Sequence, residues 1–121
     1  MNAIQHYLTT YVAGNTVVVT WLSTPDVLSW DDAIDVSDAV IDTLKQLDSP
    51  TLIVDLESID YANTAFLAMM LRCHKFVANQ GGLFVICKPC ESVLDILKLM
   101  SLDVVWPIFA SCEQALACHP I

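Results

Sequence analysis

Glycine and basic residues are scarce in this chain of 121 residues, and each shortage excludes a class of function. The 3 glycines form neither GxGxxG nor a P-loop, so the chain lacks the glycine-rich loops that hold nucleotide phosphates. Its 5 Lys and Arg residues stand against 14 Asp and Glu residues, a formal net charge of -9. Such a surface repels the phosphates of nucleic acids and anionic membranes, whereas it allows a basic protein partner.

Long apolar runs are also missing, and the first residues do not have the pattern of a leader. No hydrophobic stretch reaches the roughly 18 residues that a membrane span needs, and residues 1–6 bring no basic cluster before an apolar stretch, so no secretory signal is expected. The cysteines are odd in number, in a chain hydrophobic enough to build its own core. We therefore expect reduced thiols in a cytoplasmic protein rather than a disulfide framework. The cysteines are Cys73, Cys87, Cys90, Cys112 and Cys118.

What the chain does contain predicts one ordered domain over residues 1–121. Strands alternating with helices are expected to be parallel and joined by right-handed crossovers, whereas the first two strands form an antiparallel hairpin around Gly14. The expected fold class is α/β, a small mixed but mostly parallel sheet with helices packed against it, and Pro107 suits an edge strand. Periodicity and turn signals predict strands over 6–12, 16–22, 51–56, 83–87 and 104–109, and helices over 30–47, 64–79, 92–100 and 111–118.

The start of the second predicted helix is the strongest candidate site. A buried strand over 52–56 leads through a polar turn into a helix that opens with Asn63 and Thr64. The free N–H groups and positive dipole end of a helix N-terminus favour a negative charge, so Thr64 is a candidate acceptor of a phosphate group. The alternative is that Asn63 or Thr64 serves only as the N-cap that helices need.

Asp26 is a second candidate, in the loop after the second predicted strand. If that strand lies beside the strand over 51–56, Asp26 and Thr64 share the carboxyl end of the sheet, where α/β proteins usually carry function. The alternative is an ordinary solvated turn residue.

The cysteines and histidines offer rival chemistry. Cys87 and Cys90 have CxxC spacing between a strand and a helix, the layout of a dithiol redox site. No second CxxC completes a zinc site, and Cys118 and His119 could add ligands only if the terminus folds back. His74 follows an apolar helix stripe and is expected to be a half-buried packing residue. Because no catalytic constellation appears, we expect a binding module without cofactor or metal rather than an enzyme.

Four segments in order carry a family resemblance. Val54-Asp-Leu-Glu-Ser-Ile-Asp-Tyr-Ala-Asn-Thr64, followed by Leu67 through Lys75, is similar to V-D-L-x-x-V-x-F-x-D-S-S/T-G-L. The other segments are similar to a glycine pair with its strand, to L-L-x-x-T-G-L-D and to a typical ending: Gln80 through Ile86, Ile96 through Asp103, and Val105 through Phe109 with Ser111 through Leu116. Over nearly its whole length the chain thus resembles the STAS domain, the family of bacterial anti-sigma factor antagonists.

The resemblance implies a regulatory protein that binds an anti-sigma factor, often also a serine kinase, until phosphorylation of one hydroxyl breaks the complex. Thr64 matches that hydroxyl and Asp26 matches the loop aspartate of the family. The implied partner surface comprises Asp26, Asn63, Thr64, Ala65, Phe66, Met69 and Met70.

Three residues depart from the family motif. Asn63 replaces Asp, Ala65 replaces Ser or Thr, and Phe66 replaces Gly. Because Phe66 is a large exchange beside the implied surface, a scaffold or ligand-binding module that is never phosphorylated is the alternative. Exposed Trp106 and Phe109 near an edge strand would also allow a homodimer.

Overall fold

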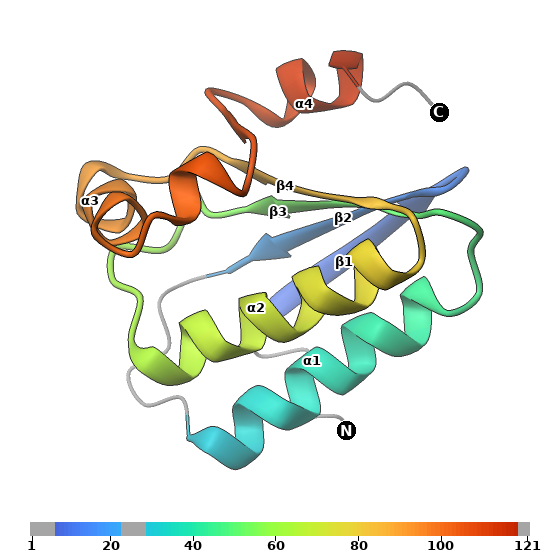
Figure 1. Cartoon of the computed structure of the whole chain (residues 1–121), viewed down its shortest axis with the longest axis horizontal. Coiled ribbons are helices and arrows are strands. Elements are labelled where there is room, and N and C mark those ends of the chain that lie inside the picture. The colour runs from blue at the N-terminus through green and yellow to red at the C-terminus, as the bar shows by residue number, and fades with distance from the viewer. Residues whose placement is uncertain (1–6, 23–28, 119–121) are drawn as a thin grey trace.

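The computed structural model describes residues 7–22 and 29–118 and shows one five-stranded sheet with strand order β1-β2-β3-β4-β5 (Figure 1). β1 pairs antiparallel with β2 through a turn at Gly14, whereas β2, β3, β4 and β5 are parallel. The mixed, mostly parallel sheet predicted from the sequence is therefore confirmed. The strands are β1 (Leu8–Ala13), β2 (Thr16–Trp21), β3 (Thr51–Asp55), β4 (Leu83–Cys87) and β5 (Ile108–Phe109).

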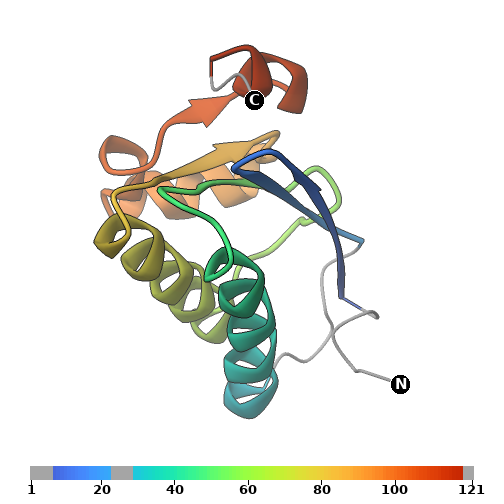
Figure 2. The ribbon, with the colours of Figure 1, turned by 90° about the vertical axis from the view of Figure 1, so that its right-hand side faces the viewer.

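The helices lie on both faces of the sheet. α1 and α2 lie side by side across one face, and α4 lies on the opposite face (Figures 1 and 2). α1 begins where the Ser29 hydroxyl accepts the Asp32 N–H at 3.0 Å, the capping contact that the sequence predicts. The helices are α1 (Trp30–Leu44), α2 (Thr64–Asn79), α3 (Glu91–Leu99) and α4 (Cys112–Cys118).

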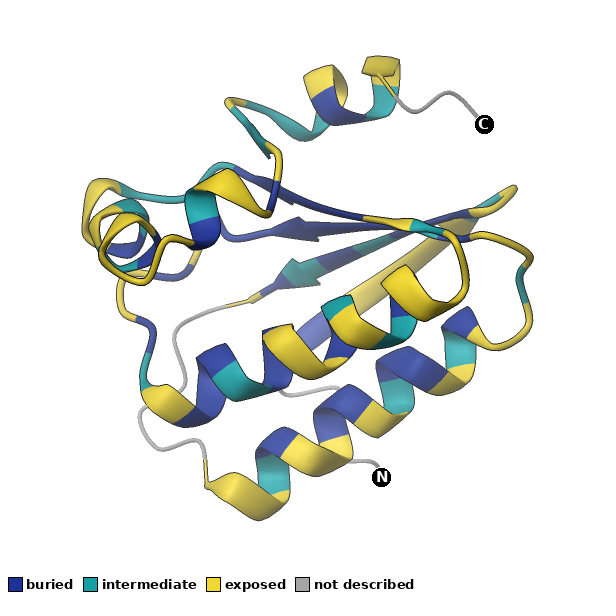
Figure 3. Cartoon of the chain, viewed as in Figure 1, coloured by how far each residue is buried: buried dark blue, intermediate teal, exposed yellow. Residues whose placement is uncertain are grey.

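Most of the core lies between the sheet and the α1 and α2 face. Alternate strand residues point to this face, among them Val17, Val19 and Trp21 of β2 and Leu52 and Val54 of β3. The buried residues of α1 and α2 meet them, and Val93 and Leu97 of α3 join the same cluster. Figure 3 shows the buried stripes of both helices turned toward the strands.

The opposite face carries a much smaller cluster. The intervening strand residues Ile53, Val85 and Cys87 pack there against Ala115 of α4. Half-buried side chains complete this cluster: Val18, Phe109, Cys112 and Leu116. β3 and β4 are consequently covered on both faces, as their apolar sequences predict.

The predicted last strand over 104–109 is wrong in extent. Leu102–Val104 forms a 3-10 helix, and only Ile108–Phe109 pairs with β4. Pro107 has no N–H to donate, and its carbonyl accepts the Ile86 N–H at 2.9 Å. β5 is an edge strand, as the proline suggested.

Candidate functional site

The carboxyl ends of the parallel strands meet at one edge of the sheet. β2 is the neighbour of β3 in parallel register, with Thr20 opposite Asp55. The segments that follow β2 and β3 therefore start from the same edge of the sheet. The sequence predicts that Asp26 lies near Thr64 if these two strands are neighbours, and they are. Asp26 itself lies outside the described residues.

Asn63 caps α2 and leaves the Thr64 side chain available. The Asn63 side-chain oxygen accepts the Phe66 N–H at 2.8 Å, and its carbonyl accepts the Leu67 N–H at 3.0 Å. Thr64 is the first residue of the helix and is exposed. Because Asn63 is the N-cap, the Thr64 hydroxyl does not perform that role. A phosphate on Thr64 would lie close to the free N–H groups at the positive end of α2.

The predicted contact residues after Thr64 lie in the core. Ala65, Phe66, Met69 and Met70 are all buried. The Phe66 ring is 1% exposed and packs on Trp21 with ring centroids 4.8 Å apart. The buried arc of α2 is wide because the helix packs against both the sheet and α1. Of the residues predicted here, Asn63 and Thr64 keep accessible side chains.

A groove between α1 and α2 adds surface that the sequence did not predict. It has a volume of about 330 Å³ and is lined by Trp30, Ala33, Ile34, Ser37, Ala68, Met69 and Arg72. Trp30 is 59% exposed and Ile34 47% exposed, although both are large and apolar. Thr64 lies one helical turn before Ala68, so the two residues share one side of α2. The only sequence signal was that Trp30 and Ile34 fall outside the buried stripe of α1.

Arg72 closes the groove with a network of polar contacts. Its Nη1 donates to Ser37 Oγ at 2.6 Å and to the Ile34 carbonyl at 3.3 Å, and it forms an ion pair with Asp38. These contacts bind α2 to α1 across the groove. The cation is thereby engaged by the protein itself. Of the other α1 carboxylates, Asp32 accepts the Tyr7 hydroxyl and Asp42 pairs with Lys45, while the exposed Asp31 and Asp35 keep this surface acidic.

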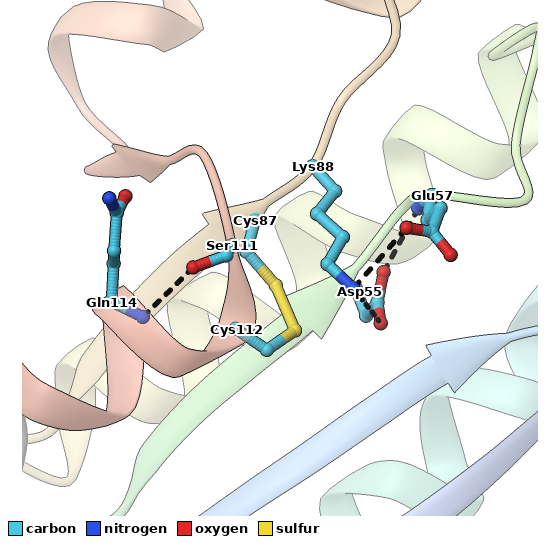
Figure 4. Close-up of a disulfide and its surroundings, with 7 residues drawn as sticks. All are labelled: Asp55, Glu57, Cys87, Lys88, Ser111, Cys112 and Gln114. Carbon is cyan, nitrogen blue, oxygen red and sulfur yellow. Dashed lines mark hydrogen bonds and ion pairs between the residues drawn. A yellow bond between two sulfur atoms is a disulfide. The ribbon is translucent and has the colours of Figure 1, made fainter.

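At the same edge of the sheet, the carboxyl ends of β3 and β4 carry a disulfide and a small ionic cluster (Figure 4). Cys87 at the end of β4 is bonded to Cys112 at the start of α4, with Cα atoms 5.6 Å apart. Lys88 Nζ lies 3.3 Å from Glu57 Oε2 and 3.9 Å from Asp55 Oδ2, and Asp55 Oδ1 accepts the Glu57 N–H at 3.0 Å. Lys88 adopts a left-handed conformation with φ 56° directly after the strand.

Two predictions about the cysteines are corrected by this bond. The expectation that all thiols are reduced is wrong for Cys87 and Cys112, whereas Cys73, Cys90 and Cys118 are free. Cys87 is bonded to Cys112 and not to Cys90, so the CxxC pair does not form the predicted dithiol site. No local spacing rule could have paired residues 25 positions apart.

The groups capable of holding a metal ion, among the residues described, are Asp55, Cys87 and Cys112, whose ligand atoms lie within 4.8 Å of one another. The bonded sulfurs have no thiolate to offer, so this set could bind a metal only after reduction. His74 lies apart, half-buried between Phe84 and Trp106 with centroid distances of 5.6 and 5.9 Å, as a packing residue. His6 and His119 lie outside the described residues.

The predicted dimer surface consists of Trp106 and Phe109, and the prediction that Trp106 is exposed is wrong. Trp106 is 1% exposed, with its ring packed against Phe84 at 4.9 Å between centroids, so it offers no surface to a second chain. Phe109 is half-buried against the α4 cluster.

Over residues 7–22 and 29–118, no helix combines the length and hydropathy needed to cross a membrane.

Comparison with solved structures shows the same fold in several proteins. A STAS domain protein from Planctomyces limnophilus is 16% identical, with 92% of this chain and 96% of that chain covered and a TM-score of 0.80. A putative anti-sigma factor antagonist from Thermotoga maritima is 19% identical, with coverages of 96% and 97% and a TM-score of 0.80. The phosphorylated form of the Bacillus cell fate determinant SpoIIAA is 17% identical, with coverages of 91% and 96% and a TM-score of 0.67.

Identities this low show a shared fold and nothing finer. A comparison with curated proteins finds no match. The family is shown independently, because a family model described as the STAS domain matches residues 2–115. The fold, the edge that carries Thr64 and this match lead to one conclusion: the chain belongs to the STAS domain family.

Proposed function

We propose that this protein is a non-enzymatic regulatory module that works as an anti-sigma factor antagonist in the cytoplasm. It binds an anti-sigma factor or a serine/threonine kinase-like protein and so controls transcription. The observation that carries the proposal is the exposed Thr64 at the first position of α2, released from capping by Asn63. Thr64 matches the hydroxyl that STAS antagonists present for phosphorylation, and SpoIIAA, which shares this fold, exists in a phosphorylated form.

The partner surface in this proposal joins Asn63 and Thr64 to the groove between α1 and α2, with Asp26 as a further member. The exposed Trp30 and Ile34 beside the groove would cover an apolar side chain of the partner. Met69 contributes as part of the groove lining rather than as an exposed contact. Because this protein carries a formal net charge of -9, a partner with basic residues around its apolar contact fits best.

Phosphorylation of Thr64 supplies the switch. A phosphate adds a charge of roughly -1.5 to -2, which the N-terminus of α2 tolerates in the free protein. In the complex that charge would have to be desolvated at the contact, next to a partner surface shaped for a small hydroxyl. The modified protein therefore binds more weakly without any change in its fold.

The buried position of Phe66 supports Thr64 as a residue that a kinase can reach. Phe66 replaces the glycine of the family motif, and an exposed ring there would favour the scaffold alternative by blocking the kinase. The ring packs instead on Trp21 inside the core. The large substitution therefore changes the core and leaves the surface around Thr64 uncovered.

Binding measurements on matched variants test the proposal. Partner captured from the native organism with the parent chain is titrated by calorimetry with the parent, Thr64→Glu and Thr64→Gln. Thr64→Glu is expected to bind at least about tenfold more weakly, and the uncharged Thr64→Gln within about threefold of the parent. Equal affinities of parent and Thr64→Glu would disprove the charge switch. An unchanged mass after incubation with ATP and the cognate kinase would support the unphosphorylated scaffold instead.

A further inference from the structure

The Cys87–Cys112 bond is a covalent cross-link between α4 and the sheet, in addition to the short main-chain link from β5 to α4. It joins the end of β4 to the first residue of α4, across a sequence separation of 25 residues (Figure 4). α4 has 7 residues, and Ala115 is the one that is buried. A helix of that length is marginal in water, so α4 depends on its attachment and on the small cluster beneath it.

The two cysteines differ in their exposure. Cys87 is 0% exposed, at the end of a central strand, whereas Cys112 is half-buried at the first residue of α4. A reductant can therefore approach Cys112 far more easily than Cys87. Attack on Cys112 makes Cys87 the leaving group.

We propose that the Cys87–Cys112 pair is a reversible redox modification site: a dithiol reductant acts at Cys112, frees α4 and uncovers the apolar sheet face formed by Ile53 and Val85. This inference goes beyond the proposed function and does not depend on it. Ile53 and Val85 are each 0% exposed while α4 is in place. Loss of this cross-link leaves α4 held by its noncovalent contacts and by the main chain from β5, which favours local opening of the helix.

The exchange is an ordinary thiol–disulfide reaction. One thiolate of the reductant forms a bond to Cys112 Sγ while the Cys87–Cys112 bond breaks, and the Cys87 thiolate takes a proton from water. The second thiolate of the reductant then displaces Cys112, which also takes a proton. Cys87 and Cys112 gain two electrons and two protons in all, and the reductant becomes a disulfide. An excess of the oxidised dithiol reverses both steps.

Asp55 and Lys88 set the charge around this reaction. The Asp55 carboxylate lies within 4.8 Å of both sulfurs, where it opposes the negative charge that develops on Cys87. Lys88 Nζ, 3.9 Å from Asp55 Oδ2, offsets part of that charge. Asp55→Asn is therefore expected to speed reduction by roughly threefold or more, and Lys88→Ala to slow it by roughly threefold.

The test is hydrogen exchange of the full chain in oxidised and reduced dithiothreitol. Peptide mapping of the oxidised chain is expected to find the Cys87–Cys112 bond. Reduction should then accelerate amide exchange in α4 by about tenfold or more and leave α1 and α2 unchanged. Cys112→Ser should show the fast exchange in both buffers, whereas Cys118→Ser, with an exposed free cysteine removed, should respond like the parent.

Several results would overturn the proposal. Mapping that finds Cys87 bonded to Cys90, or no bond at all in the oxidised chain, removes the site. Exchange in α4 that stays slow after complete reduction shows that the bond is not what holds the helix. One equivalent of zinc that protects both thiols of the reduced chain from alkylation, and keeps α4 slow, would make this a metal site instead. If Cys112→Ser fails to fold, the reduction of the parent chain alone decides these outcomes.

Discussion

The face of the sheet under α1 and α2 differs from the face under α4 in how its residues are held. Among residues 7–22 and 29–118, 26 buried residues form the first cluster, whereas the second has 4: Ile53, Val85, Cys87 and Ala115. The first face relies on apolar area, at roughly 25 cal/mol for each Å² removed from water. The second relies on a covalent bond between Cys87 and Cys112. Reductants that break a disulfide leave the burial of apolar area unchanged, so we expect redox state to act on the second face.

Truncation of Phe66 should have the largest effect, because it opens a cavity in the large cluster. Phe66→Ala is expected to lower the free energy of unfolding by about 4 kcal/mol, measured by urea denaturation. Leu71→Ala, on the exposed side of the same helix, is the control and should change it by less than about 1 kcal/mol. A loss below about 2 kcal/mol for Phe66→Ala would mean that this face is less tightly packed than its burial indicates.

Loss of the disulfide should have the next largest effect. Closing a loop of 25 residues restricts the unfolded chain, so reduction is expected to lower the free energy of unfolding by about 3 kcal/mol. Denaturant melts of the parent with and without dithiothreitol measure this difference. Cys112→Ser should match the reduced parent in either buffer. Equal midpoints for the oxidised and reduced parent would contradict the contrast between the two faces.

Alkaline pH should weaken the α1 and α2 face through Cys73. Burial raises the pKa of its thiol from 9.0 to about 12, so the folded state keeps a proton that the unfolded chain releases. Stability is fully present below pH 9 and falls as pH rises toward 12, by about 1 kcal/mol for each pH unit. Stability measured from pH 8 to 11 should show this slope.

Two variants test whether Cys73 causes this loss of stability with rising pH. Cys73→Ala should remove its steepest part, whereas Cys118→Ala, at an exposed position, should keep it. Tyr7→Phe removes a smaller contribution of the same sign, because burial and then Asp32 raise the pKa of Tyr7. A parent slope that survives in Cys73→Ala would show that another group is responsible.

Loss of the α2 cap should have the smallest effect on the free energy of unfolding. Asn63→Ala removes the bond from its side chain to the Phe66 N–H and is expected to cost about 1 kcal/mol of unfolding free energy. Asn63→Asp keeps an acceptor oxygen and adds a charge that the helix end favours, so it should be neutral or slightly stabilising. Thermal melts of the two variants distinguish capping from packing. Equal losses in both would show that the amide group packs rather than caps.

Local features of the fold were predictable residue by residue. The range of α2, Thr64–Asn79, and that of β4, Leu83–Cys87, agree with the ranges predicted from the sequence. Local signals set these bounds. Asn63 caps the start of α2, and the glycines that follow Gln80 separate the end of α2 from the start of β4. Gly82 also has no room for a side chain, because an added Cβ would lie 1.9 Å from the Pro50 carbonyl oxygen.

The surface around Thr64 was predictable only in part. The sequence placed a hydroxyl at the start of α2, and the helix indeed begins there. It could not show that Ala65 and Phe66 turn inward, because the buried arc of α2 depends on where α1 lies. The groove between the two helices likewise exists only once they are side by side.

By itself the sequence determined the order of the elements, the parallel character of the sheet and the exposed threonine at a helix N-terminus. These follow from hydrophobic period, capping and turn residues, which act over a few neighbouring positions. Only the tertiary structure decided that Cys87 meets Cys112, that Trp106 is buried and that Trp30 and Ile34 border a groove. Those outcomes depend on which distant segments pack together, and packing of distant segments leaves no fixed spacing in the chain.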